Sequence, residues 1–297
     1  MGDRANVIVV RENNTHELYR TGWAVGIDLD LLDGPAAVLA MLPGLRRDGW
    51  WLDDTMAQGG VLLDLGRKVL LFFAWEGPST ELRHRAAMFE LIRSAWPGWE
   101  VRWLYDGAAE LREHVGLDPE YVRCRDSDLS LAPFLAPEDE DLAWPDPGGV
   151  VVTVGAGRCH IASDAFDHPV REGVSLLDRL ADAPRHGVCR LHVNSGIHLD
   201  PESRRLGWWS LYSSPQAHQV PELWPGWTVE FWQDDWERHV RACTRFSPAP
   251  FDPGREARAA VLAEAGERRA ARAGHHAQVT RLPTASPRPQ AGRPTPA

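Results

Sequence analysis

Trp96-Pro97-Gly98-Trp99 is the stretch that decides the fold, because it recurs as Trp224-Pro225-Gly226-Trp227. Each copy leads into an alternating strand pattern that ends at an aspartate, over residues 100–106 and residues 228–234. Pro-Gly favours a turn, and the flanking indole rings are expected to cap the end of a buried strand. A repeat of this kind predicts an internal duplication.

The elements around the two copies follow the same order. The hairpin predicted over residues 60–73 matches the one predicted over residues 196–209. Matching positions are 136 residues apart at Gly60 and Gly196 but 128 apart at Trp96 and Trp224, so the second long helix is expected to be truncated or absent. We predict an α+β fold of two tandem ββαββαβ-like repeats packed as a pseudo-dimer.

Local patterns predict the individual elements of the first repeat. Residues 7–10 and 17–20 favour a strand pair across an Asn13-Asn14 turn. The hairpin of residues 60–73 is apolar throughout, which predicts burial on both of its faces. Residues 80–95 have the apolar spacing of an amphipathic helix.

The composition divides the chain into four segments. They are a first α+β repeat (1–116), an acidic, proline-rich connector (117–149), a second α+β repeat (150–246) and an Arg/Ala/Pro-rich tail (247–297). The tail has eight arginines against four acidic residues, with helical propensity at first and a disorder composition afterwards.

Charge and composition exclude several classes of protein. The net charge of −10 is concentrated in residues 1–246, so a broad nucleic-acid-binding face is not expected and only the basic tail suits nucleic acid. The first residues do not resemble a signal peptide, the four cysteines form no CxxC pair, and no apolar run is long enough to cross a bilayer. We therefore expect a cytoplasmic protein with no membrane partner.

Polar residues that occur in only one repeat are the better functional candidates. The first set, Asp3, Arg4 and Asn6, precedes the first strand and could bind a small anion or orient a carbonyl group. The alternative is an ion pair between Asp3 and Arg4 that ties down the terminus. We retain the three residues as a candidate ligand-binding set.

The second set belongs to the second repeat and comprises Cys159, His160, His192, His198 and Asp200. Strand alternation predicts that His192, His198 and Asp200 share one face of a sheet. They could hold a metal ion there, or a histidine could act as a general base beside a cysteine nucleophile. The alternative is a structural role in local hydrogen bonding, since no known metal-site spacing such as HExxH is present.

Three functions remain open from the sequence. The first is binding of a small molecule or a protein partner in the groove between the two repeats. The second is a hydrolase or metal-assisted enzyme that uses His192, His198 and Asp200. The third is a regulatory or assembly protein that recruits its partner through the basic tail. The sequence defines no cofactor and no metal.

Overall fold

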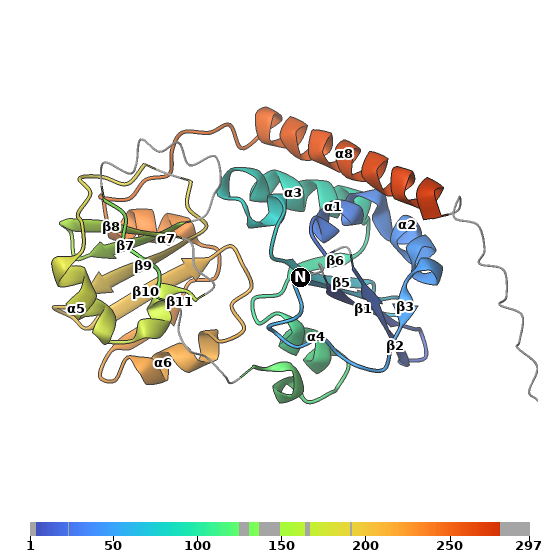
Figure 1. The fold of residues 1–297 in the computed structure, drawn as a ribbon, viewed down its shortest axis with the longest axis horizontal. Coiled ribbons are helices and arrows are strands. Elements are labelled where there is room, and N and C mark those ends of the chain that lie inside the picture. Colours follow the sequence, from blue (N-terminus) through green and yellow to red (C-terminus); the bar gives the residue numbers. More distant parts are fainter. Residues whose placement is uncertain are drawn as a thin grey trace, which may run out of the picture.

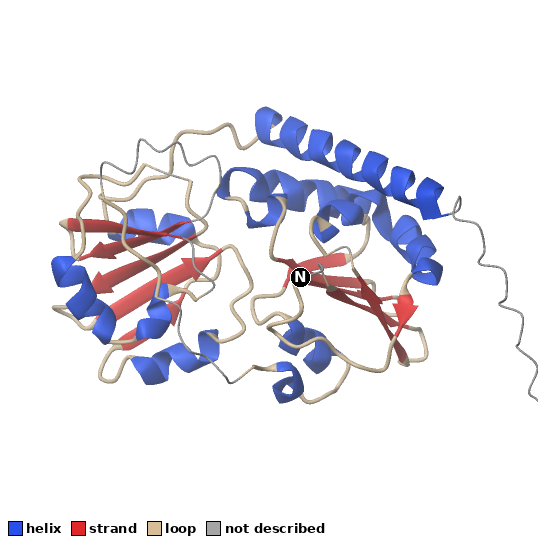
Figure 2. Ribbon diagram, in the orientation of Figure 1, coloured by secondary structure: helices blue, strands red, loops and turns tan. Residues whose placement is uncertain are grey.

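The computed structural model describes residues 4–22, 24–124, 131–136, 149–163, 167–190 and 192–279. They form two lobes, each built on its own mixed β-sheet, with a long helix lying along one of them (Figure 1). Helices pack around both sheets, as expected for the α+β class (Figure 2). Among the described helices, none combines the length and the apolar character that crossing a membrane requires.

The first lobe holds a six-stranded sheet with the order β3-β2-β1-β4-β5-β6. Its strands are β1 Ala5–Val10, β2 His16–Thr21, β3 Arg46–Arg47, β4 Gly59–Asp64, β5 Val69–Ala74 and β6 Glu100–Trp103. Every residue of β4 and β5 is buried, which confirms the predicted burial of this hairpin on both faces.

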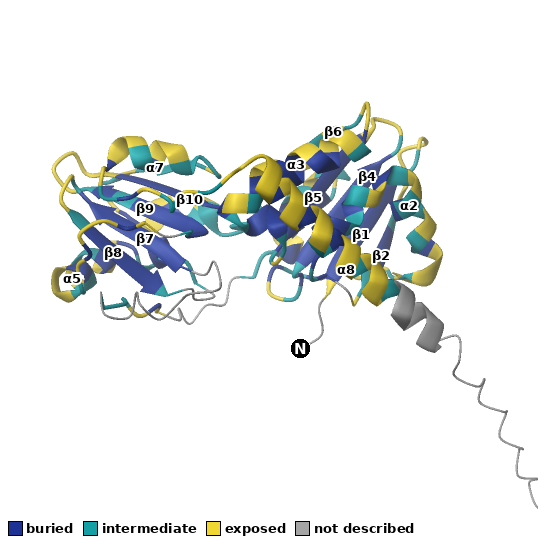
Figure 3. Cartoon of the chain, turned by 90° about the horizontal axis from the view of Figure 1, so that it is seen from above, coloured by how far each residue is buried: buried dark blue, intermediate teal, exposed yellow. Residues whose placement is uncertain are grey.

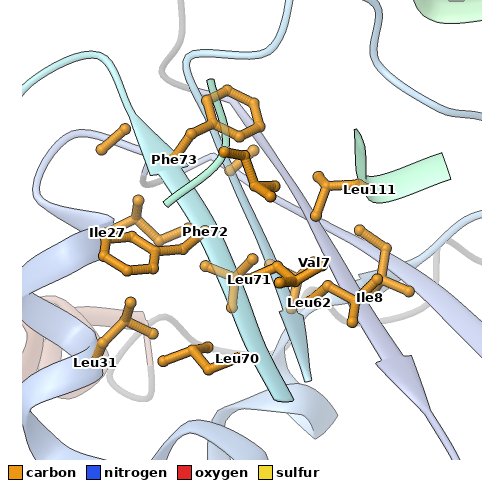
Figure 4. Close-up of a cluster of buried hydrophobic side chains, with 14 of the residues drawn as sticks. Val7, Ile8, Ile27, Leu31, Leu62, Leu70, Leu71, Phe72, Phe73 and Leu111 are labelled. Atoms are coloured by element: carbon orange, nitrogen blue, oxygen red, sulfur yellow. The ribbon is translucent and has the colours of Figure 1, made fainter. Parts of the chain in front are cut away.

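Helices cover both faces of the first sheet. They are α1 Ile27–Asp30, α2 Gly34–Met41 and α3 Leu82–Ala95 on one face and α4 Ala108–His114 on the other (Figure 1). Figure 4 shows Phe72 beside Ile27 on the α1 side of the sheet, whereas Phe73 lies toward Leu111 of α4. The core of this lobe is therefore two apolar layers separated by the sheet. Figure 3 shows the buried strands below the exposed outer faces of α2 and α3.

The second lobe holds a five-stranded sheet with the order β11-β10-β9-β7-β8. Its elements are β7 Gly149–Val154, β8 Arg158–Ser163, α5 Ser175–Asp182, β9 Ser195–Asp200, β10 Arg205–Ser210, α6 Val220–Leu223, β11 Thr228–Phe231 and α7 Trp236–Ala242. Helix α6 has 4 residues where α3 has 14, which agrees with the truncation predicted from the sequence.

Short 3-10 helices link the longer elements: η1 Leu31–Asp33, η2 Leu42–Gly44, η3 Pro78–Thr80, η4 Pro119–Val122, η6 Pro169–Glu172 and η7 Ala217–Gln219.

Strands β2-β1-β4-β5-β6 and strands β8-β7-β9-β10-β11 have the same order and the same directions. In both sheets the hairpins are antiparallel, and the pairs β1–β4 and β7–β9 are parallel, as are β5–β6 and β10–β11. The two sheets therefore share one topology, and only β3 has no counterpart among the described strands.

The two Trp-Pro-Gly-Trp stretches have nearly the same geometry. The buried indole of Trp96 donates a hydrogen bond to the carbonyl of Leu31 (2.7 Å), and that of Trp224 donates to the carbonyl of Val170 (2.8 Å). Gly98 has φ 77° and Gly226 has φ 78°, a left-handed conformation that favours glycine. In each lobe this hydrogen bond therefore joins two segments. One precedes the second hairpin of the sheet, and the other is the turn that leads into the last strand.

Helix α8 (Arg255–Val279) belongs to the first lobe, although the sequence predicts a separate tail from residue 247. Its buried residues Ala257, Val261 and Ala265 pack on the lobe, and α8 runs along α3 and α1 (Figure 1). The sequence pattern does not predict this contact, because a helix face made largely of alanines has only a weakly hydrophobic character. Such a face nevertheless permits close helix packing.

The described parts of the connector lie on both lobes: residues 117–124, with η4, pack on the first lobe beside α4, and residues 131–136 follow the edge of the second sheet. Phe134 forms a bridge with Ala162, and the amide of Leu135 donates to the carbonyl of Ile161 (2.9 Å). The predicted acidic tip at residues 138–141 and Trp144 lie outside the described residues.

Candidate functional site

Arg85 on α3 ties the two lobes together. Its side chain is buried, and its Nε donates to Oδ2 of Asp234 in the second lobe (2.9 Å) while Nη1 donates to the carbonyl of Leu211 (3.2 Å). Its guanidinium also lies 4.6 Å from the ring centroid of Trp103, a cation–π contact. Burial alone would raise the pKa of Asp234, but the charge of Arg85 and the hydrogen bonds from Tyr105 and Arg85 together outweigh it and hold that pKa below its usual value.

A second tie is made by Arg123. Its Nη1 donates to Oδ1 of Asp106 (2.8 Å) and to the carbonyl of Pro215 in the second lobe (2.7 Å). The amide of Ser214 donates to the carbonyl of Tyr105 (2.6 Å) beside it. The buried Arg85, the half-buried Arg123 and a backbone hydrogen bond therefore define how the lobes meet.

A cavity of about 690 Å³ opens between the lobes beneath α8, and we call it the inter-lobe groove. The first lobe lines it with Trp75 and Glu81, and the second lobe with Asn194 and Tyr212. Helix α8 contributes one face, formed by Glu264, Glu267, Arg268 and Ala271. The groove therefore exists only because three separate segments of the chain come together.

Gly77 lines the groove and lies directly against the buried Asp28. Gly77 has φ 122°, and a Cβ at this position would lie 2.5 Å from Oδ1 of Asp28. The buried carboxylate of Asp28 accepts hydrogen bonds from the amide of Ser79 (3.0 Å) and the amide of Leu29 (2.9 Å). Burial raises the pKa of Asp28, although these bonds oppose the shift. Only glycine leaves room here for the carboxylate below the groove.

Two carboxylates of the groove have shifted pKa values. Burial raises the pKa of Glu264, and the nearby charges of Glu81 and Asp28 raise it further. Burial also acts to raise the pKa of Glu81, but His84 and Arg83 together outweigh it, so that pKa lies below its usual value. His84 Nδ1 lies 2.7 Å and Arg83 Nε 3.6 Å from Oε2 of Glu81. Glu81 is therefore compensated by neighbouring cations, whereas the surroundings of Glu264 oppose its negative charge.

The first predicted set does not lie in this groove. Asn6 is buried in β1, where its side chain donates to the carbonyl of Leu52 and accepts from the amide of the same residue (3.0 Å each). Arg4 is exposed, and Asp3 lies outside the described residues. Asn6 thus fastens the 50–52 segment to the sheet, and it is in a different lobe from the histidines.

The histidines of the second set are separated. Strand β9 begins at Ser195, so His192 precedes the strand and packs against Phe251, with 5.5 Å between ring centroids. Burial, and then the charges of Arg83 and His84, lower the pKa of His192. No ring contact or hydrogen bond described in the structure joins it to His198.

Asp200 caps the β9–β10 turn. Its Oδ1 accepts from the amides of Glu202 (3.1 Å) and Ser203 (3.3 Å), and the hydrogen bonds from Ser203 are the main reason why the pKa of Asp200 is lowered. Asp64 accepts from the amide of Arg67 (2.9 Å) at the matching turn of the first sheet. Asp200 is thus placed as a turn residue.

Cys159 and His160 point to opposite faces of the second sheet, because successive strand residues alternate. His160 Nδ1 lies 2.7 Å from the carbonyl of Pro184, and its pKa is lowered mainly by burial. Cys159 pairs with Thr153 on the α7 side and is fully buried. The geometry therefore prevents these two neighbours from acting on one substrate group.

Four side chains form a continuous hydrogen-bonded chain on the α7 side. Trp209 Nε1 donates to His239 Nδ1 (3.0 Å), His239 Nε2 lies 2.7 Å from Thr153 Oγ1, and that hydroxyl lies 2.8 Å from His198 Nδ1. Because an indole only donates, Nδ1 of His239 accepts and its proton is on Nε2. The hydroxyl of Thr153 then donates to His198. Burial lowers the pKa of His239 to about 3, with a smaller contribution from His198, so the chain stays neutral.

Among the described residues, no group of three or more His, Cys, Asp and Glu side chains is arranged to hold a metal ion. The metal ligands considered from the sequence are accordingly apart, with His192 outside the strand and Asp200 engaged in its turn.

Comparisons with protein-family models, with curated proteins and with solved structures found no match.

Sequence reasoning missed the groove residues and three members of the hydrogen-bonded chain, Thr153, Trp209 and His239. Glu264 and Glu267 were assigned to the tail, although their spacing of three places them on one helix face. His239 lies 128 positions after Leu111, which is also the separation of the two Trp-Pro-Gly-Trp stretches. A histidine at the position that matches a leucine of the first repeat was the signal that could have identified it.

Proposed function

We propose that the protein binds a small organic ligand in the inter-lobe groove. The observation that carries this proposal is a cavity of about 690 Å³ that draws its walls from both lobes and from α8. Ligand pockets in proteins typically measure roughly 300–1,000 Å³ and occur preferentially between domains. A cavity of this size is large enough for a molecule of some tens of atoms.

We further infer that the chain is an internal duplication, in which two related units face each other across the groove. The matching strand orders and the two Trp-Pro-Gly-Trp geometries support this inference. A seam between related units is a common place for a binding site, as in a two-fold dimer. Divergence of the units, with α3 and α8 on one side only, leaves a groove with two different walls.

The arginine contacts of α8 argue against recruitment of an acidic partner through three of the eight arginines of the basic tail. Arg268 donates to Asp30 (3.0 Å), Arg272 donates to the same carboxylate (2.8 Å), and Arg269 donates to Asp33 (2.7 Å). These three charges are already paired within the first lobe. They are therefore poorly suited to capturing an acidic partner.

A thermal-shift screen of the full chain tests the proposal. Small organic cations, anions and neutral compounds are added separately, because a ligand that binds only the native state raises Tm. Ala271→Trp places a large ring in the groove. Ala270→Trp places the same ring at the next position on α8, also exposed but outside the groove.

We expect at least one compound to raise the Tm of the wild type. Its affinity should fall about tenfold or more in Ala271→Trp, corresponding to about 1.4 kcal/mol, and stay unchanged in Ala270→Trp. A screen without any stabilising compound, or equal affinities in the two variants, contradicts the proposal.

A further inference from the structure

Helix α8 presents two acidic side chains and one arginine to the groove, Glu264, Glu267 and Arg268. The guanidinium of Arg268 is engaged by Asp30 of the first lobe, which also accepts from Arg272. The positive charge that α8 brings to the groove is therefore paired with Asp30, whereas Glu264 and Glu267 have no such partner among the described residues.

The groove contains carboxylates that the protein itself does not neutralise. Within the described residues, no hydrogen bond or ion pair involves the carboxylate of Glu264, Glu267 or Glu76, all three of which line the groove. Glu81 has the nearby His84, but it also adds to the potential at Glu264. Carboxylates gathered at a partly buried site repel one another unless a positive charge is supplied.

Two aromatic side chains line the same cavity. Trp75 comes from the first lobe and Tyr212 from the second. The hydroxyl of Tyr212 accepts a hydrogen bond from Asn194 Nδ2 (2.6 Å), which orients the ring. Aromatic faces attract ammonium groups, and indole does so most strongly. Carboxylates together with aromatic rings are a combination suited to an organic cation.

The size of the cavity favours an organic cation over a metal ion. A metal ion needs several ligands within about 2–2.6 Å of one point. The described residues offer no such group, and about 690 Å³ exceeds the space that an ion occupies.

We propose that the ligand of the inter-lobe groove is a small organic cation with one or more ammonium or guanidinium groups. Glu264 and Glu267 supply the charge from α8, and Trp75 and Tyr212 supply the aromatic walls. This inference rests on the proposed function, because it names the chemical class of the molecule bound there.

Isothermal titration of the full chain tests the class of ligand. The cationic probes are spermidine, agmatine and choline, compared with the dianion suberate and the neutral triethylene glycol. The salt concentration is kept at about 0.15 M, where exposed charges more than about 8 Å apart are largely screened. Glu264→Gln removes a groove charge at constant shape, and Glu256→Gln removes an exposed charge on α8 outside the groove.

We expect one cation to bind with one-to-one stoichiometry, and about tenfold more weakly to Glu264→Gln than to Glu256→Gln. Glu267→Gln, which is exposed, gives a second reading should Glu264→Gln fail to fold. The proposal is overturned if none of the three cations binds, or if the two glutamine variants bind the cation equally.

The two proposals can fail separately. If suberate or triethylene glycol binds in place of the cations and Ala271→Trp abolishes that binding, the groove remains the site and its cationic preference is wrong. If no probe binds and the broader screen is also negative, both proposals are wrong.

Discussion

At four matching positions, the first lobe has apolar side chains and the second has side chains that form hydrogen bonds. In the first, Ile8 pairs with Leu62, and Phe73 and Leu111 both lie close to Gly60. Figure 4 shows the four apolar side chains Ile8, Leu62, Phe73 and Leu111. In the second, the corresponding side chains are Thr153, His198, Trp209 and His239, joined by hydrogen bonds. The apolar quartet of the first lobe (Ile8, Leu62, Phe73 and Leu111) thus occupies the positions that the polar quartet (Thr153, His198, Trp209 and His239) occupies in the second.

This difference shows what a buried sheet face requires. Polar side chains are accepted there when each has a partner, because burying an unpaired polar atom costs free energy. Trp209, His239 and Thr153 each have a hydrogen-bond partner within the quartet, and the series of hydrogen bonds ends at the half-buried His198. The polar quartet therefore needs no catalytic role to account for its presence.

We expect the largest effect from a substitution at the centre of the polar quartet. Thr153→Val removes the hydroxyl that both histidines contact, leaving the Nε2–H of His239 and Nδ1 of His198 without it. We expect a loss of about 3 kcal/mol in the free energy of unfolding, measured by urea denaturation. Ile8→Val, the matching change in the apolar quartet, should cost about 1 kcal/mol. Equal costs for the two variants would show that the hydrogen bonds contribute no extra stability.

A fall in pH should have opposite effects on the stability that Asp54 in the first lobe and His239 in the second contribute. The pKa of Asp54 in the first lobe is raised to about 7 by burial and then by Asp106, against the charge of Arg123. Its contribution to stability is fully present below pH 3.8 and is lost as the pH rises toward 7. The pKa of His239 is lowered to about 3 from 6.5, so its contribution is lost as the pH falls through that range.

Asp54→Asn isolates the first of these effects. The amide cannot ionise, so the variant should be about 2 kcal/mol more stable than the wild type at pH 7.5 and no more stable at pH 4. Urea denaturation at the two pH values measures this difference. A gain of the same size at both values would mean that ionisation of Asp54 is not its cause.

A smaller effect should separate the matching glycines. A Cβ at Gly60 would lie 2.4 Å from Cε1 of Phe73 and 2.6 Å from Cδ1 of Leu111, both in apolar side chains, whereas one at Gly196 would lie 2.5 Å from Nε1 of Trp209 and 2.7 Å from Nδ1 of His239. Gly196→Ala therefore disturbs a hydrogen bond as well as the packing. We expect it to cost about 1 kcal/mol more than Gly60→Ala in thermal unfolding. The reverse order would contradict the assigned importance of the Trp209–His239 bond.

The elements of the fold were largely predictable, because strands and turns leave local patterns. The repeated Trp-Pro-Gly-Trp stretch and the apolar hairpin predicted over residues 60–73 gave the positions of β4, β5 and β6. The docking of α8 was not predictable in this way, since Ala257 and Ala265 carry little hydrophobic signal. Its contacts depend on how closely α8 can approach α3.

The candidate site was only partly predictable. His198 was a candidate because it is a polar residue that occurs in only one repeat, but its partner Thr153 follows from the register of two strands distant in sequence. The groove was expected between the repeats, yet its charge comes from Glu81 and Glu264, in segments that the sequence assigned to different domains. Tertiary packing alone brings such residues together.

The most direct measurement is a crystal structure of the full chain soaked with the tightest-binding compound of the screen. The proposed function predicts density for that compound beneath α8, in contact with Tyr212 of the second lobe and Trp75 of the first. Density for the compound elsewhere on the protein, with no density for it in the groove, would contradict the assignment of the inter-lobe groove as the binding site.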